Sequence, residues 1–344
     1  MFPKTIEWMD GVVKLIDQTK LPSKLEFIEC RTVERIAKAI KNMEVRGAPA
    51  IGAAAAFALA LAAHHSKSLS INDLILEIKR AAEIIRETRP TARNLFWAIE
   101  RILRKIEGFS GEINELRNLV INEALKIADE DVKSNLSIGE YGAQLIEDGD
   151  VILTYCNAGS LATVYYGTAL GVIRSAWKQG KKIKVIAAET RPKLQGARLT
   201  CFELMYEGIP VTLVTDNSIG LLMQKGLISK VIVGADRILR DGTVYNKIGT
   251  YMVAVLANRH NIPFYVAAPK STFDLTSTRD QIIIEEREKE EVTEICGCKI
   301  APEGVNVINY AFDMTPPELV SAIITELGII YPPYEENIRK ILGT

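Results

Sequence analysis

The sequence carries almost no net charge, and this absence limits the partners that it could have. Its 42 lysine and arginine residues are balanced by 43 aspartate and glutamate residues, which leaves a formal net charge of -1 over 344 residues. A protein that binds nucleic acid normally concentrates basic residues on one face or in one stretch. We therefore expect no nucleic-acid partner.

Cysteine and histidine are also scarce, and their spacing argues against cross-links and metal sites. The five cysteines are odd in number and scattered, so we expect no disulfide framework and a reducing, cytoplasmic location. Cys296 and Cys298 have the spacing of half a metal site, but no second Cys or His pair at ligand spacing completes it. The three histidines lie in helical stretches without partners. The sequence thus predicts no metal site.

Long apolar runs and nucleotide-binding loops are missing as well. The first ten residues contain no apolar segment of the kind that a signal peptide needs. The longest apolar run, residues 48–63, is alanine-rich and shorter than the roughly 20 residues that span a bilayer, so we expect a buried helix, a soluble protein and no membrane partner. No G-x-G-x-x-G follows a strand-like run and there is no P-loop, so nucleotide binding is not favoured.

The chain is longer than one compact core usually covers, and its hydrophobic pattern changes near residue 150. Residues 1–112 carry mostly helical patterns, with helix starts expected at Thr32, at Ser70 with Asp73, and at Pro90. We predict a mainly helical N-terminal domain (residues 1–112), a long connecting helix (113–149) and an α/β domain (150–344).

From residue 150 onward, short apolar runs alternate with helical patterns, which is typical of a parallel sheet with helices on both faces. The segment Arg240–Thr243 has the pattern of a hairpin turn and predicts a local insertion after one strand. The expected strands are residues 151–155, 183–188, 211–214, 231–234 and 264–268, and the expected helices are residues 161–179, 197–207, 219–226 and 248–260. The fold class is therefore α/β.

The stretch Asp150–Thr163 predicts a buried strand, a tight turn and the start of a helix, with the thiol of Cys156 at the carboxyl end of the strand. In open parallel sheets, ligands bind in the crevice at that end. A thiol that faces a helix N-terminus also tends to have a lowered pKa, because the helix dipole and the free N–H groups favour the thiolate. We infer from this stretch that Cys156 takes part in chemistry.

Side chains that could do chemistry or hold an anion follow nearly every expected strand. A single aspartate in such a place is more often a cap or turn residue than a catalyst. Five successive strands that end in this way favour one ligand-binding edge instead. The residues are Cys156 and Asn157; Glu189, Thr190, Arg191, Gln195 and Arg198; Asp216 and Asn217; Asp236 and Arg237; and Lys270, Ser271 and Thr272.

A second candidate lies in the helical domain, at Arg46-Gly47-Ala48-Pro49. Proline presets a helix start, whose free N–H groups lie where Gly47 lets the backbone approach a ligand. The guanidinium of Arg46 can grip a phosphate in bidentate fashion, so this stretch is a candidate phosphate cradle. A tight loop that feeds a close-packed helix explains it equally well. Individually weaker signals of the same kind occur at Arg89 and at Asn246-Lys247.

Five blocks of the sequence closely resemble the S-methyl-5-thioribose-1-phosphate isomerases of methionine salvage, and the resemblance covers nearly the whole chain. The wider superfamily also contains ribose-1,5-bisphosphate isomerases and the regulatory subunits of initiation factor 2B. The blocks are RGAPAIG (46–52), TYCNAGSLAT (154–163), ETRPKLQGARLT (189–200), VGADRI (233–238) and NKIGTY (246–251).

The resemblance implies a helical N-terminal domain, a Rossmann-like C-terminal domain without a dinucleotide, and a homodimer. It also implies that a small sugar phosphate, an aldose 1-phosphate, is converted to the 1-phosphoketose without a metal or an organic cofactor. Mapped motif by motif, the catalytic pair falls on Cys156 and Asp236. The implied substrate contacts are Arg46, Gly47, Ala48, Arg89, Gln195, Asn246 and Lys247.

The chemistry of such a substrate suits this pair of residues. The phosphate on the anomeric oxygen keeps the ring from opening freely, so a group must protonate the ring oxygen while hydrogen moves from C2 to C1. A carboxyl group in a dry pocket has a raised pKa, and we hypothesise that Asp236 is this acid. Cys156, as thiolate, would relay the proton through an enediolate; a direct hydride shift is the competing path.

Two alternatives differ in what they require of the sequence. A ribose-1,5-bisphosphate isomerase needs extra cations for its second phosphate, and no added basic cluster lies near the motifs. A non-catalytic subunit like those of initiation factor 2B has no need for a thiol and a carboxyl at two strand ends together with a phosphate cradle.

Overall fold

The computed structural model describes residues 2–89 and 92–343 of the chain. The chain forms two compact units, one from Met1–Ser137 with Ala158–Gly171 and the other from Ile138–Asn157 with Val172–Thr344. The domain boundaries expected from the sequence, at residues 112 and 149, stay predictions.

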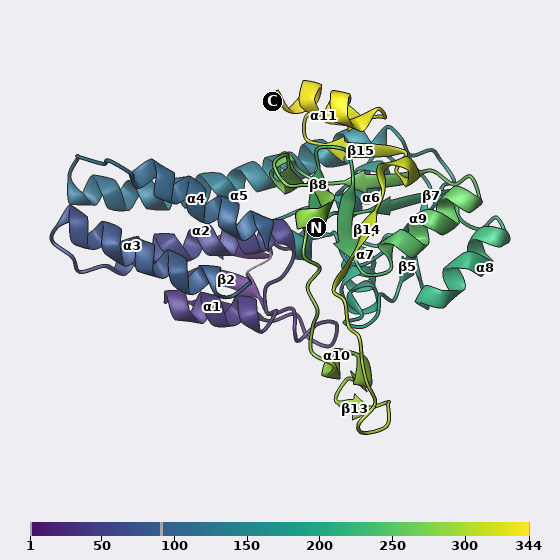
Figure 1. The fold of residues 1–344 in the computed structure, drawn as a ribbon, viewed down its shortest axis with the longest axis horizontal. Helices are drawn as coiled ribbons and strands as arrows, with labels where there is room; N and C mark the ends of the chain where they lie inside the picture. The colour runs from purple at the N-terminus through teal and green to yellow at the C-terminus, as the bar shows by residue number, and fades with distance from the viewer. Residues whose placement is uncertain (1, 90–91, 344) are drawn as a thin grey trace. The chain divides into compact units, whose positions relative to one another are not determined.

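The first unit is built from long helices and a small antiparallel sheet (Figure 1). In the sheet, the central strand β2 pairs with β1 on one side and with β3 on the other. The strands are β1 (Ile6–Trp8), β2 (Val13–Ile16) and β3 (Phe27–Cys30), and the helices are α1 (Val33–Lys41), α2 (Ala48–His65), α3 (Ile71–Arg86), α4 (Arg93–Ile106) and α5 (Ile113–Ala143), whose last residues belong to the second unit.

Two of the expected helix starts are confirmed by their caps. The hydroxyl of Thr32 accepts a hydrogen bond from the N–H of Arg35 at 3.2 Å, and that of Ser70 accepts one from the N–H of Asp73 at 3.1 Å. Each satisfies one of the donors that a helix N-terminus leaves unpaired. Pro90, the third expected start, lies outside the described residues.

Helix α2 is the core of the first unit. It begins at Ala48, its alanines 53–56 are completely or almost completely buried, and it packs against α1, α3 and α4. In the described part of the chain it is the one helix whose length and apolar composition would allow it to cross a membrane, and most of it is buried inside the protein. A core helix of small side chains explains both features.

The second unit contains a large, mostly parallel sheet, which confirms the α/β class. All five strands expected from the sequence are present. Two more, β15 and the antiparallel β16, extend one side of the sheet and were not expected. The order across the sheet is β16 (Gly328–Ile330), β15 (Ala322–Thr325), β10 (Phe264–Ala267), β7 (Lys230–Val233), β4 (Val151–Thr154), β5 (Lys184–Ala188) and β6 (Val211–Val214).

The predicted start of the helix after Cys156, at residue 161, is wrong. The chain forms only a short 3₁₀ turn at Ser160–Ala162, and α6 begins at Ala169. Tyr166 and Gly167 have φ angles of 77° and 83°, which an α-helix cannot contain. The remaining helices are α7 (Cys201–Tyr206), α8 (Ile219–Gln224), α9 (Thr250–Arg259), α10 (Glu290–Thr293) and α11 (Tyr334–Leu342).

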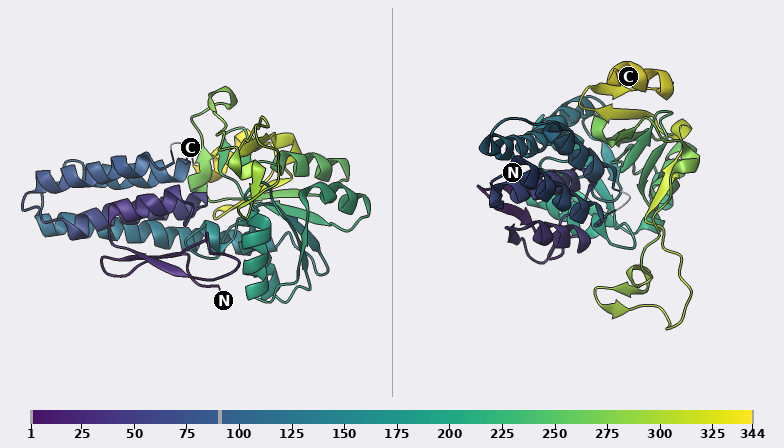
Figure 2. Two further views of the ribbon diagram at one scale, coloured as in Figure 1. Left: turned by 90° about the horizontal axis from the view of Figure 1, so that it is seen from below. Right: turned by 60° about the vertical axis from the view of Figure 1, so that its left-hand side comes forward.

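A second, smaller sheet begins in the segment that follows β7. The hairpin expected at Arg240–Thr243 is confirmed, because it joins the antiparallel strands β8 and β9. A long segment that carries α10 and the β12–β13 hairpin (Glu294–Ile295 and Cys298–Lys299) extends away from the large sheet (Figures 1 and 2). The small sheet has the order β11 (Phe273–Asp274), β8 (Arg237–Leu239), β9 (Val244–Lys247) and β14 (Phe312–Thr315).

The dense packing of α2 predicts that it tolerates no added volume. Ala55 is fully buried, so Ala55→Leu must displace its neighbours and should lower the free energy of unfolding by about 1–3 kcal/mol. Urea unfolding followed by circular dichroism measures this. As a control, Leu69→Ala on a side chain that is 96% exposed should change it by no more than about 0.5 kcal/mol. Equal effects of the two variants would contradict the packing argument.

Candidate active site

The large sheet changes direction between two hydrogen-bonded parallel neighbours, β4 and β7. From β4 the chain continues outward through β5 and β6, and from β7 it continues the opposite way through β10 and β15. In open α/β sheets, ligands bind outside the carboxyl ends of the strands at such a reversal. Cys156 follows β4 and Asp236 follows β7, so both candidates leave the sheet at the same edge.

Cys156 is half-buried and adopts a left-handed backbone conformation, with φ of 64°. Side chains hold the backbone on both sides of this residue. Its N–H donates to Thr190 Oγ1 at 2.8 Å, and its carbonyl accepts a hydrogen bond from Thr200 Oγ1 at 2.7 Å. Because no helix starts immediately after this residue, the expected thiol at a directly following helix N-terminus is not the arrangement found.

Asp216, which follows β6, serves the backbone of a neighbouring loop. Its carboxylate accepts the N–H groups of Thr190 at 2.8 Å and Arg191 at 2.7 Å, and Thr190 is itself left-handed, with φ of 64°. Asp216 is therefore a turn residue that fixes the loop against which Cys156 is held.

Lys247 lies within electrostatic reach of both Cys156 and Asp236. Its side chain is buried, and Nζ donates to the carbonyl of Ala311 at 2.8 Å and lies 4.8 Å from the centre of the Phe312 ring. Burial and, to a smaller extent, the charge of Arg287 lower the pKa of Lys247 to about 8, whereas the charges of Cys156 and Asp236 act in the opposite direction. Asp236 is half-buried, and its N–H donates to the carbonyl of Tyr245 at 2.9 Å.

Asp313, on β14, is a residue that sequence reasoning missed. It lies opposite Asn246 in the register of the small sheet and accepts the N–H groups of Gly249 at 2.6 Å and Tyr251 at 3.1 Å, at the start of α9. Burial raises its pKa to about 6, against these hydrogen bonds and the charge of Lys247. Its strand is far from β9 in the sequence, and no local pattern marks it.

Asn246 is buried and donates to Thr250 Oγ1 at 3.0 Å.

Gln195 is buried, and its Oε1 atom has no hydrogen-bond partner among the described residues. A buried acceptor without a partner costs roughly 1–3 kcal/mol, so a bound donor is the natural way to satisfy it. Gln195 precedes a π-helical turn, Gly196–Thr200, and such turns are frequent at functional sites. A Cβ atom on Gly196 would lie 1.7 Å from the carbonyl oxygen of Ala188, so only glycine fits at the start of this turn.

The remaining candidates lie in the first unit. Arg46 is half-buried, and its Nε donates to Gln18 Oε1 at 2.9 Å. Gly47 has φ of 94°, and a Cβ atom there would lie 2.4 Å from Cα of Ala162, so its close approach is to the protein's own backbone. Helix α2 begins at Ala48 with a proline in its first turn and no side-chain cap.

Arg89 follows α3 and is half-buried, and its carbonyl accepts the N–H of Ala92 at 3.1 Å. Among the described residues, no group of three or more His, Cys, Asp or Glu side chains is arranged to hold a metal ion.

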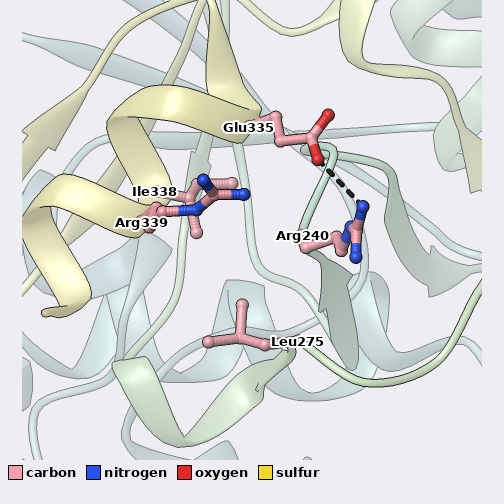
Figure 3. Close-up of a pocket in the computed structure, with 5 residues that line it drawn as sticks. All are labelled: Arg240, Leu275, Glu335, Ile338 and Arg339. Carbon is pink, nitrogen blue, oxygen red and sulfur yellow. Dashed lines mark hydrogen bonds and ion pairs between the residues drawn. The ribbon is translucent and has the colours of Figure 1, made fainter. Parts of the chain in front are cut away.

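One surface pocket lies elsewhere in the second unit, beside α11 (Figure 3). It has a volume of about 190 Å³, and an ion pair of 3.0 Å between Arg240 and Glu335 lies at one side of it. Its lining residues are Arg240, Leu275, Glu335, Ile338 and Arg339, and the predicted site residues are not among them.

The chain thus combines a helical unit with an α/β unit whose parallel sheet reverses between β4 and β7. The chain belongs to the initiation factor 2 subunit family, whose model matches residues 44–332.

Particular relatives are more informative than the family. A methylthioribose-1-phosphate isomerase from Thermosipho melanesiensis is 56% identical over 338 residues, which cover 98% of this chain and 97% of that relative. The crystal structure of 5-methylthioribose 1-phosphate isomerase from Pyrococcus horikoshii is 47% identical, with a TM-score of 0.94 over 99% of this chain and 96% of that one. A structure from Archaeoglobus fulgidus, described as subunit delta of the translation initiation factor eIF-2B, is 57% identical, with a TM-score of 0.89 and complete coverage of both chains.

The buried charge of Lys247 predicts an unusual stability effect. Because burial disfavours the ammonium form, Lys247→Met should raise the free energy of unfolding at pH 7, by up to about 3 kcal/mol, since one pKa unit corresponds to about 1.4 kcal/mol. The folded state binds fewer protons than the unfolded state between the lowered pKa of about 8 and the ordinary value of 10.5, so the wild type gains stability as the pH rises through this window. The difference in the free energy of unfolding between Lys247→Met and the wild type should therefore shrink as the pH rises through this window. Urea unfolding at a series of pH values measures it.

A matched control is Lys230, which is also buried but pairs with Asp150 at 2.8 Å. Lys230→Met leaves a buried carboxylate unpaired and should destabilise the protein. If Lys247→Met destabilised the protein to the same extent at pH 7, the account of Lys247 as a buried charge that costs stability would be wrong.

Proposed function

We propose that this chain is an aldose–ketose isomerase that converts S-methyl-5-thio-α-D-ribose 1-phosphate to S-methyl-5-thio-D-ribulose 1-phosphate in methionine salvage. The observation that carries the proposal is the placement of Cys156 and Asp236 after two neighbouring parallel strands, at the reversal of the sheet, with Lys247 in electrostatic reach of both. The names of the relatives that match over nearly the full length support the substrate.

The proposed roles follow from the chemistry that each side chain offers. Asp236 protonates the ring oxygen as the bond from that oxygen to C1 breaks. Cys156, as thiolate, takes the proton from C2 and returns it to C1 through an enediolate. The hydroxyl on C2 gives its proton to the carboxylate of Asp236 and becomes the ketone, which restores the acid. Electrostatic stabilisation and positioning supply much of the rate in such a site.

Substrate binding is proposed for the residues that offer charge or free hydrogen-bonding groups. The buried, unpartnered Oε1 of Gln195 is suited to a sugar hydroxyl. The uncapped start of α2 and the guanidinium of Arg46 are suited to phosphate. The full proposed set is Arg46, Gly47, Ala48, Arg89, Gln195, Asn246 and Lys247.

We also propose that the large sheet is the Rossmann-like wound sheet expected from the sequence, without a dinucleotide. Numbered along the chain, its parallel strands follow the order 3-2-1-4-5-6 of doubly wound folds, which supports this interpretation. A homodimer in the cytoplasm is part of the same proposal. Large exposed apolar side chains on α7 to α9, including Met205, Leu221 and Tyr251, support self-association.

One assay tests the function. Ketose formation is measured with methylthioribose 1-phosphate and, in parallel, with ribose 1,5-bisphosphate. We expect turnover of the first substrate and little or none of the second, because the methylthio group needs an apolar pocket where a second phosphate needs cations. Preference for the bisphosphate would make the chain a ribose-1,5-bisphosphate isomerase, and turnover of neither would favour a non-catalytic subunit of the initiation-factor type.

The two proposed catalytic residues should differ in their kinetic effects. Asp236→Asn removes the acid without changing the shape of the side chain, so kcat should collapse while KM changes little. Cys156→Ser should cause a smaller but still large loss of kcat. Near-native turnover of Asp236→Asn would refute the assignment of the acid, and full activity of Cys156→Ser would favour the hydride path.

A further inference from the structure

A buried ion cluster lies behind the proposed catalytic cysteine, and no step of the reaction described above uses it. Arg174, on α6, is 2% exposed, and its guanidinium pairs with Glu203 at 2.7 Å and with Glu207, both at α7. Glu203 is completely buried. Removing such charges from water is expensive, and replacing them by apolar side chains is often neutral or stabilising. Stability alone therefore does not explain why these charges are buried here.

Hydrogen bonds connect this cluster to the backbone of Cys156. Glu203 Oε1 accepts from Asn157 Nδ2 at 2.9 Å, and the same amide nitrogen donates to Thr200 Oγ1 at 3.1 Å. The hydroxyl of Thr200 in turn donates to the carbonyl of Cys156 at 2.7 Å. The chain of contacts thus runs from Arg174 through Glu203, Asn157 and Thr200 to Cys156.

The charge of Glu203 fixes the direction of every bond in this chain. A carboxylate only accepts hydrogen bonds, so the amide group of Asn157 must turn its nitrogen toward Glu203 and toward Thr200. Since the Thr200 oxygen accepts from Asn157, its own proton is free to point at the carbonyl of Cys156. The guanidinium of Arg174, 2.7 Å away, compensates the charge of the completely buried Glu203.

The residue at the end of the chain needs such support. A left-handed conformation is unfavourable for a residue other than glycine and persists only where the surroundings hold it. The N–H of Cys156 is held by Thr190, whose own hydroxyl proton is directed at the carbonyl of Ala188. The hydroxyl of Thr200 holds the carbonyl of Cys156.

We propose that Glu203 is a positioning residue that acts through Asn157 and Thr200 to hold Cys156 in its left-handed conformation and so to aim the thiol at the substrate. The inference rests on the proposed catalytic role of Cys156. It extends the active site to residues that do not touch the substrate.

Replacing Thr200 tests the last link of the chain. Thr200→Val keeps the shape of the side chain but removes the hydroxyl, and we expect kcat to fall about tenfold with KM within about twofold, because the loss of positioning affects the reacting thiol more than binding. Thr200→Ser restores the hydroxyl and should recover most of kcat. The rate at which iodoacetamide alkylates Cys156, followed by mass spectrometry of its peptide, should fall in Thr200→Val and recover in Thr200→Ser.

A double-mutant cycle tests whether Glu203 acts through Thr200. Glu203→Gln should reproduce the kcat loss of Thr200→Val, and the double variant should lose little more than either single variant, because both break the same chain. Asp150→Asn is the matched control: it breaks another buried ion pair, with Lys230, at the opposite end of β4, and should lower stability while leaving kcat and Cys156 alkylation unchanged.

Two results would overturn the proposal. One is a kcat and an alkylation rate in Thr200→Val that equal those of the wild type. The other is a multiplicative loss in the double variant, which would mean that Glu203 and Thr200 act independently. Failure of the proposed function is distinguishable from both, because a wild type that turns over no sugar phosphate still reports the position of Cys156 through its alkylation rate.

Discussion

The hydrogen-bonded pairing of β4 with β7 is the constraint on which the candidate site depends. These strands are neighbours in the sheet but are separated in the sequence by β5 and β6, so the pairing brings two distant segments to one edge. Cys156 leaves the sheet from one strand and Asp236 from the other. The small sheet then continues directly from Asp236 into β8 and β9 and delivers Lys247 to the same region. A change of strand order in the large sheet would separate Cys156 from Asp236 and Lys247.

Buried charges in the second unit fall into two kinds, and the difference indicates their roles. Arg174 and Lys230 each have a carboxylate within 2.8 Å, which compensates for the loss of water. The ammonium group of Lys247 instead contacts a carbonyl oxygen and an aromatic ring, and burial outweighs the attraction of Cys156 and Asp236 and lowers its pKa. A buried cation of this kind lowers the stability of the protein and is compatible with the proposed anionic substrate.

Local patterns predicted those features of the fold that depend on neighbours in sequence. The caps Thr32 and Ser70, the five apolar strands and the hairpin at Arg240–Thr243 are all of this kind. The predictions were wrong or incomplete where contacts between residues far apart in the sequence determine the local structure. The apolar pattern after Cys156 suggested a helix, but the N–H of Val164 is taken by Asp131 at 2.7 Å, and the chain turns through left-handed residues instead. Asp313 and its strand β14 could not be predicted, because the strand is defined by its pairing with β9, which lies far away in the sequence.

Asp236 and Asp313 both lie within electrostatic reach of Lys247, and their different positions in the fold bear on which of them is the proposed acid. Asp313 has a pKa raised to about 6, which by itself would make it the better proton donor near neutrality. Both of its oxygens, however, accept backbone N–H groups at the start of α9, so its carboxylate is engaged in fixing the turn that follows Asn246 and Lys247. Asp236 instead follows β7 at the reversal of the sheet, on the strand paired with that of Cys156. This position supports the proposed role of Asp236 as the acid, whereas the hydrogen bonds of Asp313 support the start of α9.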